Sequence, residues 1–168
     1  MNWALPLIQL LYNVTRRYAQ SGQGVRHGIE DHSDGDWQQR MVALSTTGAT
    51  LLHVKPDSAM FDLEIQGSNY AVVLLRRGGT VLITLCSCIT FPRGRAPRDV
   101  SAGLSRMNRQ LERCDYELLH GDNGDFYCVQ CQINLERLSP DTFYAGVNNM
   151  LPHVMMLDKY LLENDYAR

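Results

Sequence analysis

Three stretches in the middle of the chain, separated by glycine-containing turns, restrict the fold more than any other feature. Residues 60–66 alternate apolar with polar side chains, which is the period of a β-strand that has one solvated face. Residues 70–77 and 80–91 form the next two strands on either side of Gly78-Gly79, a hairpin signal. Strands joined by tight turns pair antiparallel. The sequence therefore predicts an antiparallel sheet at the centre of the fold.

A second hairpin is predicted in the other half of the chain. Its strands are residues 115–120 and 126–135, which are joined by Asp122-Asn123-Gly124-Asp125. An Asn-Gly pair tolerates the positive φ angles of a type I′ turn, so the hairpin signal is strong. Residues 49–54 are a weaker candidate for a first strand. We therefore expect a sheet of about five strands.

Two amphipathic helices are predicted around these strands. The first opens at Asp99, after a basic loop, and its apolar face consists of Val100, Leu104, Met107 and Leu111. The second begins at Ser139-Pro140, with the serine as N-cap and the proline in the first turn. Its apolar stripe consists of Phe143, Val147, Leu151, Val154, Leu157 and Leu161. Pro152 lies within that stripe and should kink or split the helix.

The N-terminal part of the chain contains two further predicted helices. Residues 3–19 have apolar residues at helical spacing, whereas residues 21–36 are rich in glycine and acids and have no periodicity. Asp36 is a candidate cap for a short helix that carries Trp37. We therefore expect residues 1–35 to form an N-terminal helix and flexible linker. Residues 36–168 are expected to form a single α+β domain with the order α-βββ-α-ββ-α.

Composition places the chain among ordinary globular proteins. It has 168 residues, of which 45% are hydrophobic and 20% charged, enough for one domain with a buried core. The N-terminus does not have the features of a signal peptide, and the apolar runs are too short to cross a membrane. Five cysteines are then expected to be reduced thiols of a cytoplasmic protein without a membrane partner.

The cysteine spacing raises the question of a metal or redox site. Cys128-Val129-Gln130-Cys131 could ligate zinc or carry redox chemistry, but residues three apart on a strand point to opposite faces. Cys86 and Cys88 share one face of their strand, and we interpret them as small apolar residues that face a helix. The five histidines show no pairing typical of a helical metal site. We therefore predict no metal and no cofactor.

Motifs typical of nucleotide-dependent and hydrolytic enzymes are missing or misplaced. Gly22-Gln23-Gly24 follows a predicted helix rather than a strand, and neither lysine follows a glycine-rich loop. There is no G-x-S-x-G motif, and the aspartates at 31, 34 and 36 do not fit the EF-hand spacing. We predict that the chain is not an enzyme and has no catalytic residues.

Positive charge is concentrated in one part of the chain. Residues 76–113 hold eight arginines against Asp99 and Glu112, a formal charge of +6, whereas the rest of the chain carries −8. The arginines that could bind an anion or an acidic partner are Arg93, Arg95, Arg98, Arg106, Arg109 and Arg113. The alternative is a solvated helix face and loop, which we favour. Because residues 93–113 contain no aromatic residue to stack on bases, nucleic acid is not the expected partner.

The order of helices and strands resembles the type III secretion chaperone-like fold. From about residue 70 onward, the chain is similar to the bacterial YbjN-type family, described as sensory transduction regulators. Residues 104–111 resemble its middle helix, and Tyr116-Glu117-Leu118 with residues 122–125 resembles its acidic hairpin. Leu138-Ser139-Pro140 matches the start of its long final helix. The resemblance implies protein binding, chaperone-like or regulatory roles and dimers, and it implies no catalytic residues.

Two functional hypotheses follow from the sequence. The first is a non-enzymatic, chaperone-like or regulatory domain that binds a partner polypeptide through a sheet edge and apolar helix faces. The alternative is an anion- or nucleic-acid-binding module that uses the arginines of residues 93–113.

Overall fold

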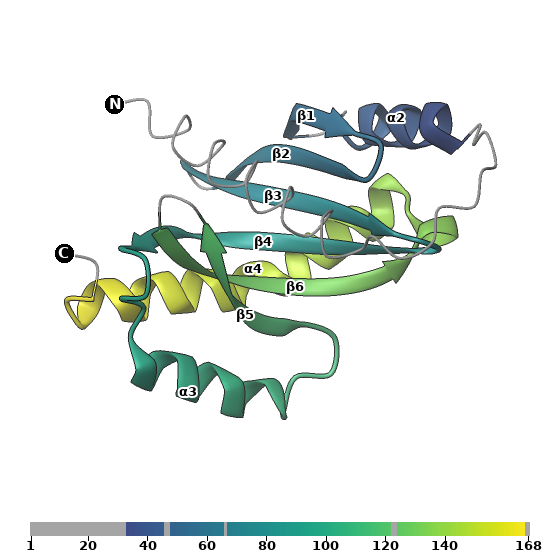
Figure 1. Cartoon of the computed structure of the whole chain (residues 1–168). Coiled ribbons are helices and arrows are strands. Elements are labelled where there is room, and N and C mark those ends of the chain that lie inside the picture. Colours follow the sequence, from purple (N-terminus) through teal and green to yellow (C-terminus); the bar gives the residue numbers. More distant parts are fainter. Residues whose placement is uncertain (1–32, 46–47, 66, 122–123, 167–168) are drawn as a thin grey trace.

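The computed structural model describes residues 33–45, 48–65, 67–121 and 124–166, which fold around one antiparallel sheet. Its strands are β1 (Ala49–Lys55), β2 (Ser58–Ile65), β3 (Ser68–Arg77), β4 (Thr80–Phe91), β5 (Asp115–Gly121) and β6 (Gly124–Asn134). Their order in the sheet is β1-β2-β3-β4-β6-β5 (Figure 1). The α+β class and the antiparallel sheet are therefore confirmed.

The sheet has one strand more than the five expected, because the weak candidate at residues 49–54 forms β1. This strand pairs with β2 from Ala49 opposite Leu63 to Lys55 opposite Ser58. The indole Nε1 of Trp37 donates a hydrogen bond to the Lys55 carbonyl oxygen at 2.8 Å, which ties the preceding helix to the strand. Because β1 is an edge strand, much of it is exposed, and its apolar pattern is correspondingly weak.

Helices cover one face of the sheet. They are α2 (Ser33–Leu44), α3 (Arg98–Asn108) and α4 (Pro140–Glu163), with a short 3-10 turn, η1 (Leu135–Arg137), before α4. In Figure 1, α4 runs along the central strands β4 and β6, α2 lies beside β1, and α3 lies beyond β5. The main core between sheet and helices is built on Trp37, Phe61, Leu85, Tyr127 and Phe143, all of them buried.

The other face of the sheet carries a second, smaller apolar cluster. Its buried members are Met60, Ala71, Val73, Leu75, Cys86, Leu119, Phe126 and Cys128. None of the described helices contributes to it, and the prediction that Cys86 faces a helix stays a prediction, because the expected helix at residues 3–19 is outside the described residues. Cys86 and Cys128 are direct partners across β4 and β6, on the face away from α4.

The N-terminal end of the described chain corrects one capping prediction. Helix α2 already begins at Ser33, and Asp36 is within its first turn rather than at its N-cap. There the Asp36 carboxylate pairs with Arg40 one turn later, at 2.9 Å. The predicted helix at residues 3–19 is outside the described residues, and the domain division after residue 35 stays a prediction.

The two later helices differ from expectation in length and continuity. Helix α4 is capped by Ser139, as predicted, and the Thr142 N–H donates to its hydroxyl at 3.3 Å. Pro152 does not split it: the proline is exposed, while Met150 and Val154 on either side are buried against the sheet. Helix α3 ends at Asn108, so Leu111 and Arg113 follow the helix instead of belonging to it.

Gly124 should be the least replaceable glycine of the second hairpin. Its φ angle is +145°, and a Cβ there would lie 2.3 Å from the Phe91 carbonyl oxygen. We expect Gly124→Ala to lower the free energy of unfolding by at least about 2 kcal/mol, measured by urea denaturation. Gly79→Ala is the matched control, because a Cβ at Gly79 meets nothing within 4 Å. Equal free energies of unfolding for the two variants would contradict the conclusion that the hairpin requires glycine at position 124.

Candidate partner-binding groove

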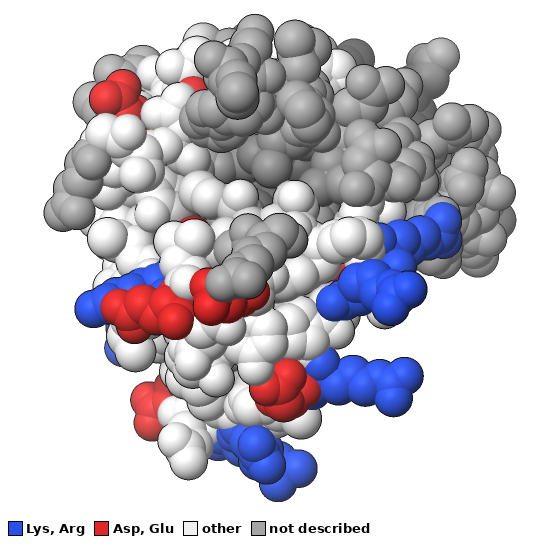
Figure 2. Space-filling view, turned by 90° about the vertical axis from the view of Figure 1, so that its left-hand side faces the viewer, with Lys and Arg blue, Asp and Glu red and all other residues white. Residues whose placement is uncertain are grey.

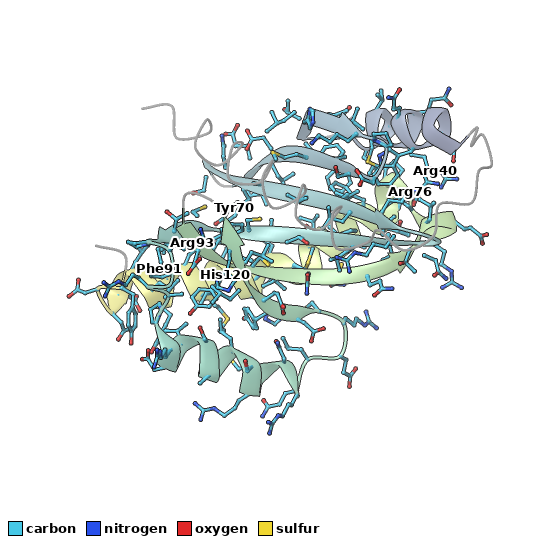
Figure 3. All side chains as sticks on the ribbon, in the orientation of Figure 1. Arg40, Tyr70, Arg76, Phe91, Arg93 and His120 are labelled. Carbon is cyan, nitrogen blue, oxygen red and sulfur yellow. The ribbon has the colours of Figure 1, made fainter. Side chains whose placement is uncertain are left out.

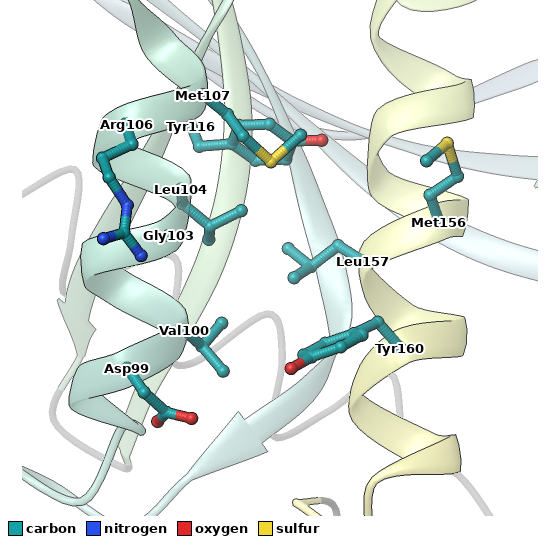
Figure 4. A pocket seen from close by; sticks show the side chains of 10 residues that line it. All are labelled: Asp99, Val100, Gly103, Leu104, Arg106, Met107, Tyr116, Met156, Leu157 and Tyr160. Carbon is teal, nitrogen blue, oxygen red and sulfur yellow. The ribbon is translucent and has the colours of Figure 1, made fainter.

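An open apolar groove lies between α3 and α4, with Tyr116 of β5 between the two walls (Figure 4). Its volume is about 430 Å³. Ten residues line it: Asp99, Val100, Gly103, Leu104, Arg106, Met107, Tyr116, Met156, Leu157 and Tyr160. Among the described residues, the lining contains no histidine, cysteine, serine or lysine, and what these residues offer is mainly apolar contact area.

The α3 wall is fixed by one side chain at its C-terminal end. Val100 and Leu104 anchor the helix in the core. Asn108 then donates from Nδ2 to the Tyr116 carbonyl oxygen at 2.8 Å and accepts from the Tyr116 N–H at 2.7 Å. This pair of hydrogen bonds uses both ends of the Asn108 amide, and it sets the distance of α3 from β5.

The α4 wall is held to the sheet by a buried carboxylate. Ser87 of β4 donates its hydroxyl to Asp158 at 2.5 Å, and the Cys88 N–H donates to the other carboxylate oxygen at 3.3 Å. These contacts lie where the pairing of β4 with β6 is irregular, between Cys86 and Thr90. Burial raises the pKa of Asp158, and the hydrogen bonds from Ser87 and Cys88 only partly offset this. Asp158 thereby fixes the rotation of α4 and directs its neighbour Leu157 into the groove.

Large apolar side chains remain exposed along the groove. Met107 on α3 is 39% exposed, and Met156 and Tyr160 on α4 are 64% and 48% exposed. They are three of the six large apolar side chains that are exposed among the described residues. In Figure 4, Leu157 and Tyr160 extend from α4 toward α3. Exposed apolar side chains gathered at one hollow are typical of an interaction site.

Gly103 opens the middle of the α3 wall. A glycine inside a helix costs about 0.5–1 kcal/mol relative to alanine. Nothing in the fold requires this one, because a Cβ there meets no atom within 4 Å and its φ is not in the left-handed region. The missing side chain leaves this part of the groove wall open.

One end of the groove is closed by the segment after α4. The Tyr166 hydroxyl donates to the Asp99 carboxylate at 2.5 Å, and the Tyr166 ring lies against Tyr160 at 6.2 Å between centroids. The hydrogen bond lowers the pKa of Asp99 and raises the pKa of Tyr166 to about 12. At neutral pH the Asp99 carboxylate therefore stays ionised and the Tyr166 hydroxyl stays protonated. Their hydrogen bond joins the first turn of α3 to the end of α4.

The six predicted site arginines are all exposed, but they do not form one patch. Arg93 and Arg95 lie on the β4–α3 loop, and Arg98 begins α3. Arg106 is in the last turn of α3, Arg109 is its C-cap, and Arg113 lies beyond it. Within the described residues, no acidic side chain pairs with any of the six. Arg106 is the member that lines the groove.

The wider basic stretch is also dispersed over the molecule. In Figure 3, Arg76 and Arg93 are at opposite ends of the sheet. Figure 2 shows basic side chains (blue) at the left, right and bottom of the view, two of them adjoining at the right, with acidic groups (red) among them. The arginines near the end of α3 also lie at the negative pole of the helix dipole. This distribution of arginines does not favour a single phosphate-binding surface.

The structure places the predicted cysteine motif on two faces of the sheet, as expected. Cys128 belongs to the smaller apolar cluster, whereas Cys131 packs against the main core. Burial raises the pKa of Cys131 to about 11 and that of Cys86 to about 12, which keeps both thiols protonated. Within the described residues, no group of three or more His, Cys, Asp or Glu side chains could hold a metal ion.

Sequence reasoning placed several groove residues on apolar helix faces, among them Leu104, Met107 and Leu157, but it did not bring the two helices together into one groove. The apolar stripe of α4 was traced through its buried positions, and Met156 and Tyr160, four residues apart beside it, were not included. Their spacing was a usable signal, since it widens the apolar stripe beyond what one sheet face can bury. Tyr116 and Gly103 gave no such signal, because their roles depend on contacts between distant segments.

Comparisons with known proteins support the fold. No protein-family model matches the chain, and no curated protein matches it. A chain of the solved ExsC–ExsE complex matches with a TM-score of 0.55 and 16% identity, over 75% of this chain and 93% of that one. A chain of the HopA1–SchA chaperone–effector complex matches with a TM-score of 0.55 and 13% identity, over 78% and 99%.

At such low identity these matches concern the fold alone. They support the chaperone-like fold that was predicted. Membership of the YbjN-type family stays a prediction, because no family model matches. None of the helices in the described part of the chain has the length and apolarity that a membrane span needs.

The buried carboxylate of α4 predicts a dependence of stability on pH. The folded-state pKa of Asp158 is raised above its ordinary value of 3.8, so its neutral form is favoured in the fold. The contribution of Asp158 to the free energy of unfolding is therefore most favourable below about pH 4. It is lost as the pH rises through the raised pKa of the folded state. Urea unfolding of Asp158→Asn should show a gain over wild type that grows between pH 4 and 7. Asp115→Asn controls for the lost charge, and a constant difference would refute the prediction.

The exposed groove residues should dominate the binding of an apolar dye. We expect Met107→Lys/Tyr160→Lys to reduce bis-ANS fluorescence by about half or more, with unfolding free energy changed by no more than about 1 kcal/mol. Val42→Lys/Leu162→Lys adds the same charge at exposed apolar positions away from the groove and should leave the signal nearly unchanged. The same loss in both variants would argue against the groove as the main apolar surface.

Proposed function

We propose that this protein is a non-enzymatic, chaperone-like or regulatory protein of the cytoplasm that binds a partner polypeptide. The observation that carries the proposal is the groove between α3 and α4, where exposed Met107, Met156 and Tyr160 surround an apolar hollow. The chaperone-like fold supports it, since a chain of similar fold belongs to a chaperone–effector complex. The resemblance to families that form dimers adds a homodimer to the proposal.

An anion- or nucleic-acid-binding role is the weaker candidate. The exposure of six arginines without acidic partners among the described residues is consistent with it. Their dispersal, and the absence of aromatic residues between residues 93 and 113, count against base stacking and a continuous phosphate track. The two candidates differ in salt dependence, because apolar contacts survive salt that screens phosphate binding.

The test is capture of partners by the tagged protein from the lysate of its own cells, at 0.1 and about 0.5 M NaCl. We expect one protein to be retained at both salt concentrations and to be absent from a tag-only control. Co-expression with that protein should then give a complex of fixed stoichiometry by size-exclusion chromatography with light scattering. This measurement also reports whether the free chain is a homodimer.

Two outcomes would count against the proposal. If only nucleic acid, or many proteins, are captured and all are lost at the higher salt concentration, the arginine-based alternative is favoured. If nothing is captured above the tag-only control, polypeptide binding of this kind is not the function of the chain.

A further inference from the structure

We propose that the groove between α3 and α4 binds an amphipathic helix whose apolar side chains enter the groove and whose acidic side chains meet Arg106 and Arg109. This inference rests on the proposed function and adds the chemical class of the partner segment. It assigns a role to three features that the fold itself does not need: the helix glycine, the exposed methionines and the arginines that have no acidic partner among the described residues.

The walls of the groove favour a helix over an extended strand. A strand binds by hydrogen bonds to a free sheet edge, whereas both walls here are helices whose backbone groups bond within the helix. The α3 wall is 11 residues long, which corresponds to roughly 16 Å, or about three helical turns. A partner segment of similar length could place apolar residues at positions i, i+4 and i+7 along the groove.

Gly103 supports close approach of a partner backbone. It is in the middle of α3 and lines the groove, and the space where its Cβ would be is open. Small residues at a contact allow two helices to approach each other more closely than larger side chains permit. Filling this space should therefore block the partner without disturbing the domain.

The methionines make the groove adaptable. Met107 and Met156 contribute long, unbranched side chains to opposite walls. Such side chains repack easily around different apolar shapes, which suits a surface that accepts a range of helices. Apolar contacts alone would thus discriminate weakly among amphipathic segments. Specificity therefore has to come from charged side chains at the edge of the groove, which we call its rim.

The charge at the rim is positive. Arg106 lines the groove, and Arg109 follows three residues later, next to it on the helix surface. Neither has an ion-pair partner within the described residues, so their charges are available to an incoming segment. Asp99 is the acidic residue of the lining, and it is already engaged by Tyr166. Acidic side chains flanking the apolar face are therefore the complementary partner.

The test uses two synthetic, fluorescein-labelled peptides of about 16 residues, both designed as helices with the same leucine face. One carries glutamates at the flanking positions and the other carries lysines. Fluorescence polarisation at 50 mM salt should give an affinity at least about tenfold higher for the glutamate peptide. Gly103→Gln should weaken that peptide at least about tenfold, whereas Ala102→Gln, at an exposed neighbour outside the groove, should not.

Charge reversal tests the role of the rim separately. Arg106→Glu/Arg109→Glu should abolish the preference for the glutamate peptide or invert it. Arg93→Glu/Arg95→Glu makes the same change of net charge on the β4–α3 loop and should keep the preference. Circular dichroism and urea midpoints no lower than those of wild type would show that the variants are folded.

Several results would overturn the proposal while leaving polypeptide binding intact. These are failure of the wild type to bind either peptide, equal binding of the two peptides, or equal effects of Gly103→Gln and Ala102→Gln. A fourth is a homodimer that Gly103→Gln dissociates, because the groove would then be occupied by a second copy. In any of these cases the proposed function stands if a protein is still captured from the lysate at both salt concentrations. Only the proposal that the groove binds an acidic amphipathic helix then fails.

Discussion

The packing of α4 across the central strands is the interaction on which the rest of the structure depends. Its buried residues, among them Phe143, Val147 and Val154, cover β4 and β6 and close the main core. The Tyr144 hydroxyl donates to the Leu44 carbonyl oxygen at 3.2 Å and so connects α4 to α2. A 24-residue helix cannot bury its whole circumference on a sheet. The residues left over on the side facing α3 become one wall of the groove.

An element of the fold was predictable from the sequence where residues close together in the chain determine it. The hairpins were predictable because alternation and the Gly-Gly or Asn-Gly signal depend on neighbouring residues, although β6 begins at Gly124 rather than at residue 126. The start of α4 was predictable for the same reason, since Ser139 caps its own helix. The end of α3 was not: the apolar period continues to Leu111, but Asn108 bonds to the backbone of Tyr116 and ends the helix there. The groove combines segments some fifty residues apart, so the pairing of its two walls was not predictable, although the spacing of Met156 and Tyr160 was a signal for one of them.

Acidic residues show the same limit of local reasoning. The sequence predicts Asp125 only as part of the turn that joins the strands of the second hairpin, yet Asp125 is fully buried. It accepts hydrogen bonds from the Gly94 N–H at 2.7 Å and from His120 Nδ1 at 2.8 Å. A buried carboxylate is tolerated only with such partners. Asp125 therefore holds the loop that leads into α3, and it helps to set where the α3 wall begins.

The groove is also a place where the needs of stability and of binding diverge. Alanine at position 103 would favour the helix by about 0.5–1 kcal/mol, and lysine at 107 or 160 would reduce the exposed apolar surface. The chain instead keeps a glycine and bare apolar side chains beside arginines that lack acidic partners in the described fold. Residues that go against local preferences, such as helix propensity, without stabilising the fold are typical of functional sites. The conflict is resolved if an apolar, acidic segment completes this surface.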